Sequence, residues 1–196
     1  MKKENAKAAD DLAEMQHQYF GRDRSWLDFN ERVLHLSTDP SVPLFERIRF
    51  LTIFSSNLDE FFMKRFALLR RRLRLGIDSR SSDGLTLRQR FTMLRRRVLE
   101  MQTQLADILN DDIRKELEAS GINIVQYDAL KPAEVKRLST WFQESVFPVL
   151  TPLSVDPGHR FPFISNLSTN LGVLLSHPIR KERHFARLKI PELVPQ

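Results

Sequence analysis

The chain has 196 residues, 41% of them hydrophobic and 29% charged, which suffices for one sizeable domain or two small ones and argues against wholesale disorder. It contains no cysteine, so disulfides, thiolate zinc sites, iron–sulfur clusters and cysteine nucleophiles are excluded. No stretch reaches the ~18 apolar residues of a membrane-spanning helix, and the first residues lack the apolar core of a secretory signal, so we expect a cytoplasmic protein.

The N-terminal part of the chain is predicted to be helical. We expect a polar arm over residues 1–20 and a helical domain over residues 21–120. Ser25 and Asp28 have the spacing of a capping box, which predicts the start of a helix that Asp39 and Pro40 end. Its apolar face, which we expect to be core and not a platform for stacking bases, comprises Trp26, Phe29, Val33 and Leu36.

A second helix is predicted to open at Pro43, with apolar positions that recur at steps of three and four. Ser55, Ser56 and Asn57 interrupt it with poor helix formers, so we predict a kink or a restart there. After a turn over residues 76–84, a third long helix is expected from Leu87 to about residue 119, ending at a glycine. The apolar positions of the second helix are Leu44, Ile48, Leu51, Leu58, Phe62, Phe66, Leu69 and Leu73.

Residues 121–196 have a different pattern, which predicts a partial α+β domain. Residues 122–125 are predicted to form a strand, residues 132–144 a helix, and residues 171–176 and 185–190 two further strands. A sheet of this size has little to cover it, so we expect the sequence to stop inside a domain. The predicted fold class is therefore an α-helical bundle followed by the incomplete start of an α+β domain.

Positive charge is concentrated in one part of the chain. Residues 64–97 contain twelve basic and two acidic residues, whereas the whole chain has a formal charge of +6. Arginine dominates this block, and its planar guanidinium suits bidentate recognition of phosphate or carboxylate. The block therefore indicates either a polyanion partner or the solvated face of helices whose arginines pair with carboxylates elsewhere in the fold.

No motif in the sequence indicates a metal site or a nucleotide-binding loop. The five histidines are scattered, and none belongs to an HExxH pattern. The six glycines are never clustered, so neither a GxxxxGK[ST] loop nor a GxGxxG fingerprint is present.

Three segments, taken together, resemble the N-terminal part of the long, phosphohistidine-forming polyphosphate kinases. They are residues 24–34 (RSWLDFNERVL), residues 43–51 (PLFERIRFL) running into 54–62 (FSSNLDEFF), and residues 147–159 (FPVLTPLSVDPGH) followed by 161–167 (FPFISNL). The resemblance implies an enzyme that reversibly transfers the terminal phosphate of ATP to inorganic polyphosphate, and it assigns residues 121–196 to a partial head domain. It places the phosphohistidine and the magnesium-binding residues in domains outside this segment.

The resemblance assigns one binding residue to this chain. The asparagine of the family's NLDEF motif contacts the adenine of ATP, and the matching position is Asn57; the alternative is that Asn57 is only a helix cap. An amide can read the adenine edge because it offers both donors and an acceptor. Asp59 and Glu60 are expected to be salt-bridge or capping partners and not general bases, and His159 is expected to be structural.

The remaining expectations concern partners and rival functions. The resemblance implies a homo-oligomer of the full-length enzyme and allows its peripheral association with membranes, with no nucleic acid as partner. Alone, this segment is expected to be inactive, since no catalytic or metal-binding residue falls within it. The rival interpretations are a basic helical nucleic-acid-binding module and a non-catalytic scaffold domain.

Overall fold

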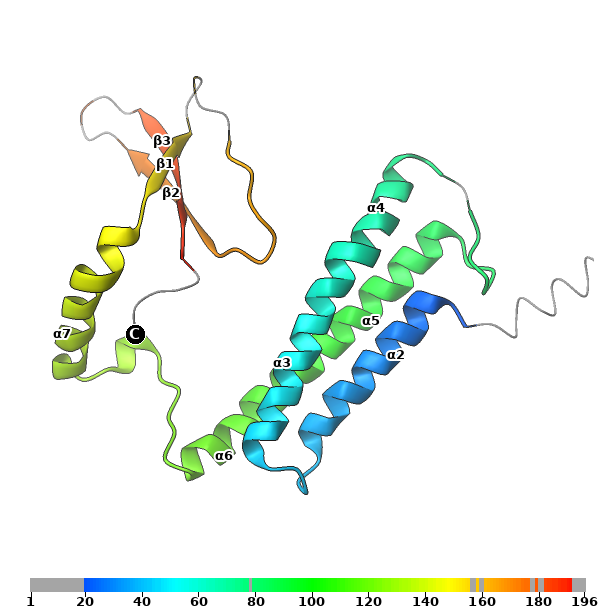
Figure 1. Cartoon of the computed structure of the whole chain (residues 1–196), viewed down its shortest axis with the longest axis horizontal. Coiled ribbons are helices and arrows are strands. Elements are labelled where there is room, and N and C mark those ends of the chain that lie inside the picture. The colour runs from blue at the N-terminus through cyan, green and yellow to red at the C-terminus, as the bar shows by residue number, and fades with distance from the viewer. Residues whose placement is uncertain are drawn as a thin grey trace, which may run out of the picture. The chain divides into compact units, whose positions relative to one another are not determined.

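The computed structural model describes residues 20–77, 79–155, 158, 161–176, 179 and 182–191. The chain divides into two compact units, Met1–Ile124 and Val125–Gln196, and each is described by itself. The first unit is helical, and the second combines helices with a three-stranded sheet (Figure 1). The predicted fold class, a helical bundle followed by an α+β region, is confirmed.

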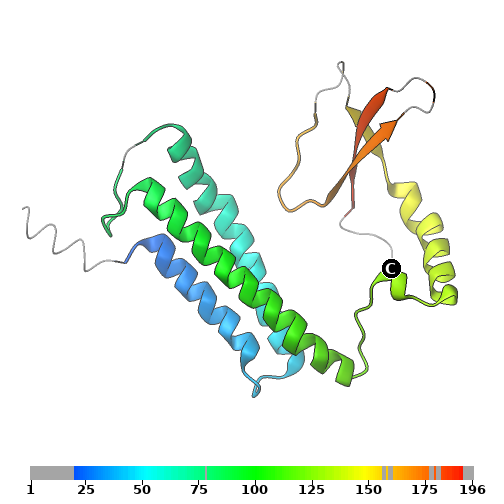
Figure 2. The same ribbon diagram turned by 180° about the vertical axis from the view of Figure 1, so that it is seen from behind.

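The described part of the first unit consists of three helical rods that lie side by side (Figures 1 and 2). The first is α2 (Arg22–His35), followed by a 3₁₀ turn at Leu36–Thr38. The second is α3 (Leu44–Phe61), which continues through a π-helical segment (Phe62–Phe66) into α4 (Ala67–Arg74). The third is α5 (Leu87–Asp107), which continues through a π-helical segment (Ile108–Ile113) into α6 (Arg114–Ala119).

The three rods enclose one apolar core. Trp26 of α2 stacks on Phe61 of α3 with ring centroids 5.0 Å apart, and Phe66 stacks on Phe91 of α5 at 4.8 Å. Aromatic pairs at such distances stabilise a core beyond the area that they bury. The buried members among the described residues are Leu27, Leu34, Leu51, Phe54, Leu58, Phe61, Leu69, Leu87, Leu94, Val98, Met101, Ile113 and Leu117.

The predicted start and core face of α2 are wrong in detail. The helix begins at Arg22 with Gly21 as its N-cap, and the Ser25 backbone N–H already donates to the carbonyl of Gly21 at 3.0 Å. The true buried face consists of Leu27, Asn30 and Leu34. Trp26 and Val33 are partly buried against the core as expected, whereas Phe29 and Leu36 are 48% and 42% exposed.

The predicted kink at residues 55–57 is also wrong, because α3 is continuous from Leu44 to Phe61. The Ser55 hydroxyl donates to the carbonyl of Leu51 at 2.9 Å, so the helix accommodates it. Three poor helix formers cost only about 0.5 kcal/mol each, and burial of Phe54, Leu58 and Phe61 outweighs that cost. The irregular turn of this rod is the π-helical segment that follows.

The loop before α5 contacts α5 itself and the start of α2. Thr86 caps α5: its hydroxyl accepts from the Gln89 backbone N–H, and the Gln89 side chain accepts from the Thr86 N–H at 3.0 Å. The Asp83 carboxylate packs on Gly21 so closely that a Cβ there would lie 2.3 Å from its oxygen. A side chain at position 21 would therefore require the Asp83 carboxylate to shift away from the start of α2.

A carboxylate organises the turn between α2 and α3. Asp39 Oδ1 accepts hydrogen bonds from the Ser41 hydroxyl at 2.7 Å and from its backbone N–H at 2.9 Å. The hydrogen bond from the Ser41 hydroxyl lowers the pKa of Asp39 most, and the bond from the Ser41 backbone N–H and the charge of Arg47 lower it further. Burial opposes these effects without cancelling them. These bonds favour the turn at neutral pH and are lost as the pH falls through the lowered pKa.

We therefore expect the Asp39 carboxyl to titrate below its ordinary value of 3.8, and to move back toward that value in Ser41→Ala. The measurement is the pH dependence of the side-chain carboxyl ¹³C shift. Thr38→Ala is the control, because the Thr38 hydroxyl donates to the carbonyl of His35 at 2.8 Å and not to Asp39. An unchanged Asp39 midpoint in Ser41→Ala would contradict this account.

The second unit contains one longer helix and a small antiparallel sheet. Helix α7 (Pro132–Trp141) begins with a proline, as helices favour, and continues into a π-helical segment (Phe142–Val146). The strands β1 (Pro152–Val155), β2 (Asn170–Ser176) and β3 (Arg183–Lys189) pair in the order β1-β3-β2. In this register Val155 and Leu174 both lie opposite Phe185.

Two strand predictions in this region need correction. Residues 122–125 form no strand; they are exposed and connect the two units. Their apolar side chains suggested pairing, yet a strand of this kind needs a neighbour, and the described sheet is complete without them. The first strand of the sheet is instead β1, which the sequence did not single out because Pro152 begins it.

Candidate functional site

Asn57, the residue that the resemblance assigns to adenine, lies inside α3 and faces α2. Four helical residues follow it, so it is not a helix cap, and the expected position at a helix break is wrong. The side chain is half-buried, and its Nδ2 donates to Oδ1 of Asn30 on α2 at 2.9 Å. The amide is therefore held by a neighbouring helix.

Asn30 fixes the orientation of that amide. It is fully buried, and its Nδ2 donates to the backbone carbonyl of Phe54 at 3.2 Å. Because this bond occupies the amino group of Asn30, its oxygen faces Asn57, and Asn57 must turn an N–H toward it. The two asparagines form a directed chain of hydrogen bonds from α3 to α2 and back to α3.

One N–H and the oxygen of the Asn57 amide remain for another partner. This is the donor and acceptor pair that an asparagine uses in bidentate recognition of adenine. Among the described residues, no further hydrogen bond occupies either group. The arrangement can therefore bind a planar edge that offers one donor and one acceptor side by side.

The acids that follow Asn57 do not form a catalytic site. Glu60 is exposed and pairs with Lys64 one turn on, whose hydrogen bond and charge lower the pKa of Glu60. Asp59 is exposed and has no ion-pair partner among the residues described. Glu60 is a salt-bridge partner, as expected, and its pKa is lowered, which is opposite to the direction that a general base requires.

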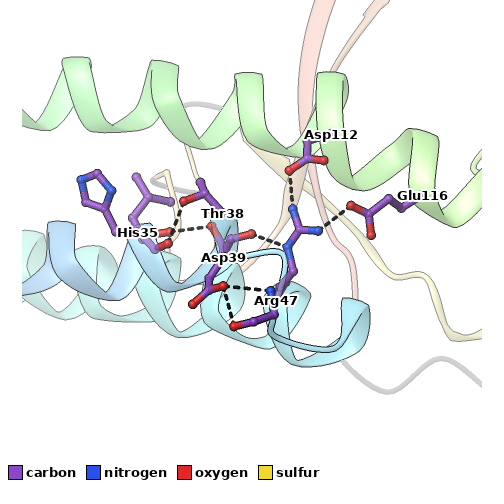
Figure 3. A network of polar contacts seen from close by, with 9 residues as sticks. His35, Thr38, Asp39, Arg47, Asp112 and Glu116 are labelled. Atoms are coloured by element: carbon purple, nitrogen blue, oxygen red, sulfur yellow. Dashed lines mark hydrogen bonds and ion pairs between the residues drawn. The ribbon is translucent and has the colours of Figure 1, made fainter.

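A buried arginine, which the sequence analysis did not single out, joins the three rods at the opposite end of α3 from Lys64. Arg47 is 3% exposed; its Nε donates to the carbonyl of Ser37 at 2.7 Å, and its two terminal nitrogens pair with Asp112 and Glu116 (Figure 3). Burial by itself lowers the pKa of Arg47, and the hydrogen bond and charge of Glu116 together with Asp112 outweigh it, so the pKa is raised. This cation is structural because all its contacts are internal.

The arginine block divides into paired and unpaired members. Asp23 binds Arg65 at 3.1 Å and Arg90 at 3.0 Å, and Arg97 pairs with Glu31 of α2. The interpretation of arginines paired with carboxylates elsewhere in the fold thus holds for these three. Arg70, Arg71, Arg72, Arg74, Arg88 and Arg95 are exposed and have no ion-pair partner in the described ranges.

The structure also bears on metal binding and on membrane insertion. In the described part of the chain, no three histidine, aspartate or glutamate side chains are grouped so that they could hold a metal ion. Likewise, none of the helices described is both long and apolar enough to cross a membrane. His159 and the arm over residues 1–19 lie outside the described residues.

The class of protein is defined by two family profiles that follow one another along the chain. Residues 19–125 match the polyphosphate kinase N-terminal domain, and residues 133–196 match the polyphosphate kinase middle domain. These matches coincide with the helical unit and with the α+β unit. The chain therefore belongs to the polyphosphate kinase family.

Individual relatives agree with this assignment. The chain is 50% identical over 90% of its length to the polyphosphate kinase of Mycolicibacterium gilvum and 49% identical over 91% to that of Streptomyces coelicolor. The crystal structure of polyphosphate kinase from Porphyromonas gingivalis superimposes on 88% of this chain with a TM-score of 0.70 and 32% identity. The chain spans about a quarter of the length of these relatives, covering 24% of the two sequences and 25% of the solved chain.

Proposed function

We propose that this chain is the N-terminal part of a polyphosphate kinase, which reversibly transfers the terminal phosphate of ATP to inorganic polyphosphate through a phosphohistidine. The observation that carries the proposal is the 50% identity over 90% of the chain to a protein of that name, together with two consecutive family profiles. The magnesium ion and the phosphohistidine would belong to parts of the enzyme outside this segment, so the segment alone would be inactive.

Within that enzyme, we propose that Asn57 contacts the adenine of ATP. Its unoccupied oxygen and N–H fit the N6 amino group and a ring nitrogen of adenine. Contact with the base is equally strong before and during phosphoryl transfer, so it contributes to binding of ATP and not to the chemical step. The surface of this unit would serve either polyphosphate or the contact between subunits of a homo-oligomer, and the complete enzyme would be cytoplasmic, with peripheral membrane association as a further property.

The test is a chimera in which this chain replaces the matching quarter of the M. gilvum enzyme. We expect the chimera to elongate polyphosphate from ATP, and Asn57→Ala to raise the apparent KM for ATP roughly tenfold with kcat unchanged, since a bidentate base contact is worth about 1–3 kcal/mol. The isolated chain, incubated with labelled ATP and magnesium, is the negative control. An unchanged KM would leave the scaffold interpretation in place of the adenine contact.

A further inference from the structure

A cavity of about 410 Å³ in the helical unit is lined by fourteen described residues, of which six are cations and two are acids. It lies between the start of α2, the second rod around residues 64–72, the loop at residues 81–83 and the start of α5. Its basic lining residues are Arg22, Arg24, Lys64, Arg65, Arg72 and Arg90. They come from three segments of the sequence, namely α2, the second rod and α5, so the fold and not a single charged run gathers them.

The two acids of this cavity are already engaged by the protein. Asp23 is only 12% exposed and binds both Arg65 and Arg90, which places these two guanidinium groups side by side. Asp83 packs on Gly21 and accepts a hydrogen bond from the Ser81 hydroxyl. The carboxylates therefore position the cations and the loop. Lys64 is paired with Glu60 outside the cavity, so the cations of this cavity without an ion pair among the described residues are Arg22, Arg24 and Arg72.

Several guanidinium groups around this cavity have donors to spare. Arg22, Arg24 and Arg72 form no ion pair with any described carboxylate. The Nε of Arg90 is buried and, among the described residues, has no hydrogen-bond acceptor. A guanidinium carries five donors in a planar fork, and buried donors are normally satisfied, so the Nε of Arg90 lacks the acceptor oxygen that a buried donor usually has.

The basic surface continues along α5 beyond this cavity. A second cavity, also of about 410 Å³, shares Arg24 and Met93 with the first and adds two arginines, Arg96 and Arg97, and two acids, Asp28 and Glu100. Glu100 lies 3.7 Å from Arg96 and 3.6 Å from Arg97, so it compensates part of their charge. A third hollow, of about 490 Å³, shares Met93 and Arg96 with the second and adds Arg88. We call these three adjoining hollows the basic track; together they extend from the start of α2 along α5 from Arg88 to Arg97.

We propose that the basic track binds a linear inorganic polyphosphate chain. Its lining supplies guanidinium forks that match phosphate oxygens. No aromatic side chain belongs to the described lining of the three hollows, and Phe20, whose ring lies 5.7 Å from the Arg24 guanidinium, is already engaged with that arginine. The lining itself therefore offers no row of rings on which successive nucleic acid bases could stack. A phosphate chain without bases therefore fits better than a nucleic acid.

This inference rests on the proposed function for the identity of the anion, but its test measures binding alone. Binding of end-labelled polyphosphate to the 196-residue chain is followed by fluorescence anisotropy at increasing salt. The test variant replaces three exposed track residues at once, Arg72→Gln, Arg88→Gln and Arg96→Gln. The control makes the same charge change at exposed members of the same block that do not line the track, Arg70→Gln, Arg71→Gln and Arg95→Gln.

We expect the track variant to bind polyphosphate roughly tenfold more weakly or worse and to lower the salt dependence of binding by about two counterions, while the control loses less than about threefold. Equal losses in both variants, or no binding by the unchanged chain, would overturn the proposal. A single-stranded oligonucleotide of equal charge that displaces polyphosphate at lower concentration would replace it with a nucleic-acid site. Such failures leave the ATP kinetics of the Asn57 chimera untouched, so they are distinct from failure of the proposed function.

Discussion

Replacing Arg47 by alanine is expected to lower the free energy of unfolding by about 3–4 kcal/mol. The substitution removes a buried cation that binds the carbonyl of Ser37 and two carboxylates of the third rod (Figure 3). Loss of one partner of a buried ion pair typically costs about 3–5 kcal/mol, because the remaining charge is left without compensation. Asp112 and Glu116 are each 45% exposed, so water compensates them in part, and we expect the lower end of that range.

The measurement is urea unfolding of the isolated chain, with the slope of the transition compared between variants. Arg49→Ala is the matched control, because Arg49 lies on the same helix, is 69% exposed and pairs only with Glu46, so its loss should cost less than ~1 kcal/mol. Arg47→Lys should fall between the two, since an ammonium keeps the charge but cannot reach three acceptors in one plane. Equal midpoints for Arg47→Ala and Arg49→Ala would show that the buried network does not hold the rods together.

The sequence predicted the long helices well because their apolar residues recur over many turns. From Leu87 to residue 119 the apolar pattern runs through two helices and a π-helical segment, across which the core positions Ile108 and Ile113 lie five residues apart, and Gly121 ends it with a positive φ of 81°. The extent of the second rod was predicted for the same reason, although the kink predicted within it is absent. An apolar pattern that recurs over five or more turns predicts a helix even where a few residues have low helix propensity.

Polar residues on buried helix faces were not predicted, because hydrophobic periodicity is defined by apolar side chains alone. Arg47 and Asn30 occupy core positions, yet each is tolerated through partners supplied by tertiary packing. The partners of Arg47 lie 65 and 69 residues further along the chain, and no local pattern connects them. The signal that could have found both is a polar residue at the spacing of a core position.

The candidate site was predicted only in part for a related reason. Motif resemblance pointed to Asn57, but low helix propensity suggested a break there, and the packing of Phe54 and Leu58 keeps the helix intact. The pairing of Asn57 with Asn30 depends on the register between α2 and α3, which neither helix determines alone. The basic track is likewise a product of packing, since only some members of the arginine block line it.

Asn30→Ala is expected to lower both the stability of the bundle and the selectivity for adenine. The variant loses a fully buried hydrogen-bonded amide, at a cost of about 2 kcal/mol. It also frees the Asn57 amide to rotate by half a turn and exchange its donor and acceptor. On the edge formed by N1 and the C6 substituent, hypoxanthine presents the donor and acceptor of adenine in reverse. If the proposed contact is made at that edge, a freely turning amide would bind either base, whereas the amide held by Asn30 would favour adenine.

Under the proposed adenine contact, we therefore expect the ratio of kcat/KM for ATP to kcat/KM for inosine triphosphate to fall about fivefold or more in the Asn30→Ala chimera. Adding Asn57→Ala to that variant should lower the ratio no further. Leu34→Ala is the control for stability: this leucine is 2% exposed one turn further along α2, and its loss should cost about 2–5 kcal/mol while the preference for ATP stays. If Leu34→Ala lowered the preference as much as Asn30→Ala, the effect would come from loosening of the bundle and not from orientation of Asn57. If Asn30→Ala kept the full preference, another group would have to orient the amide.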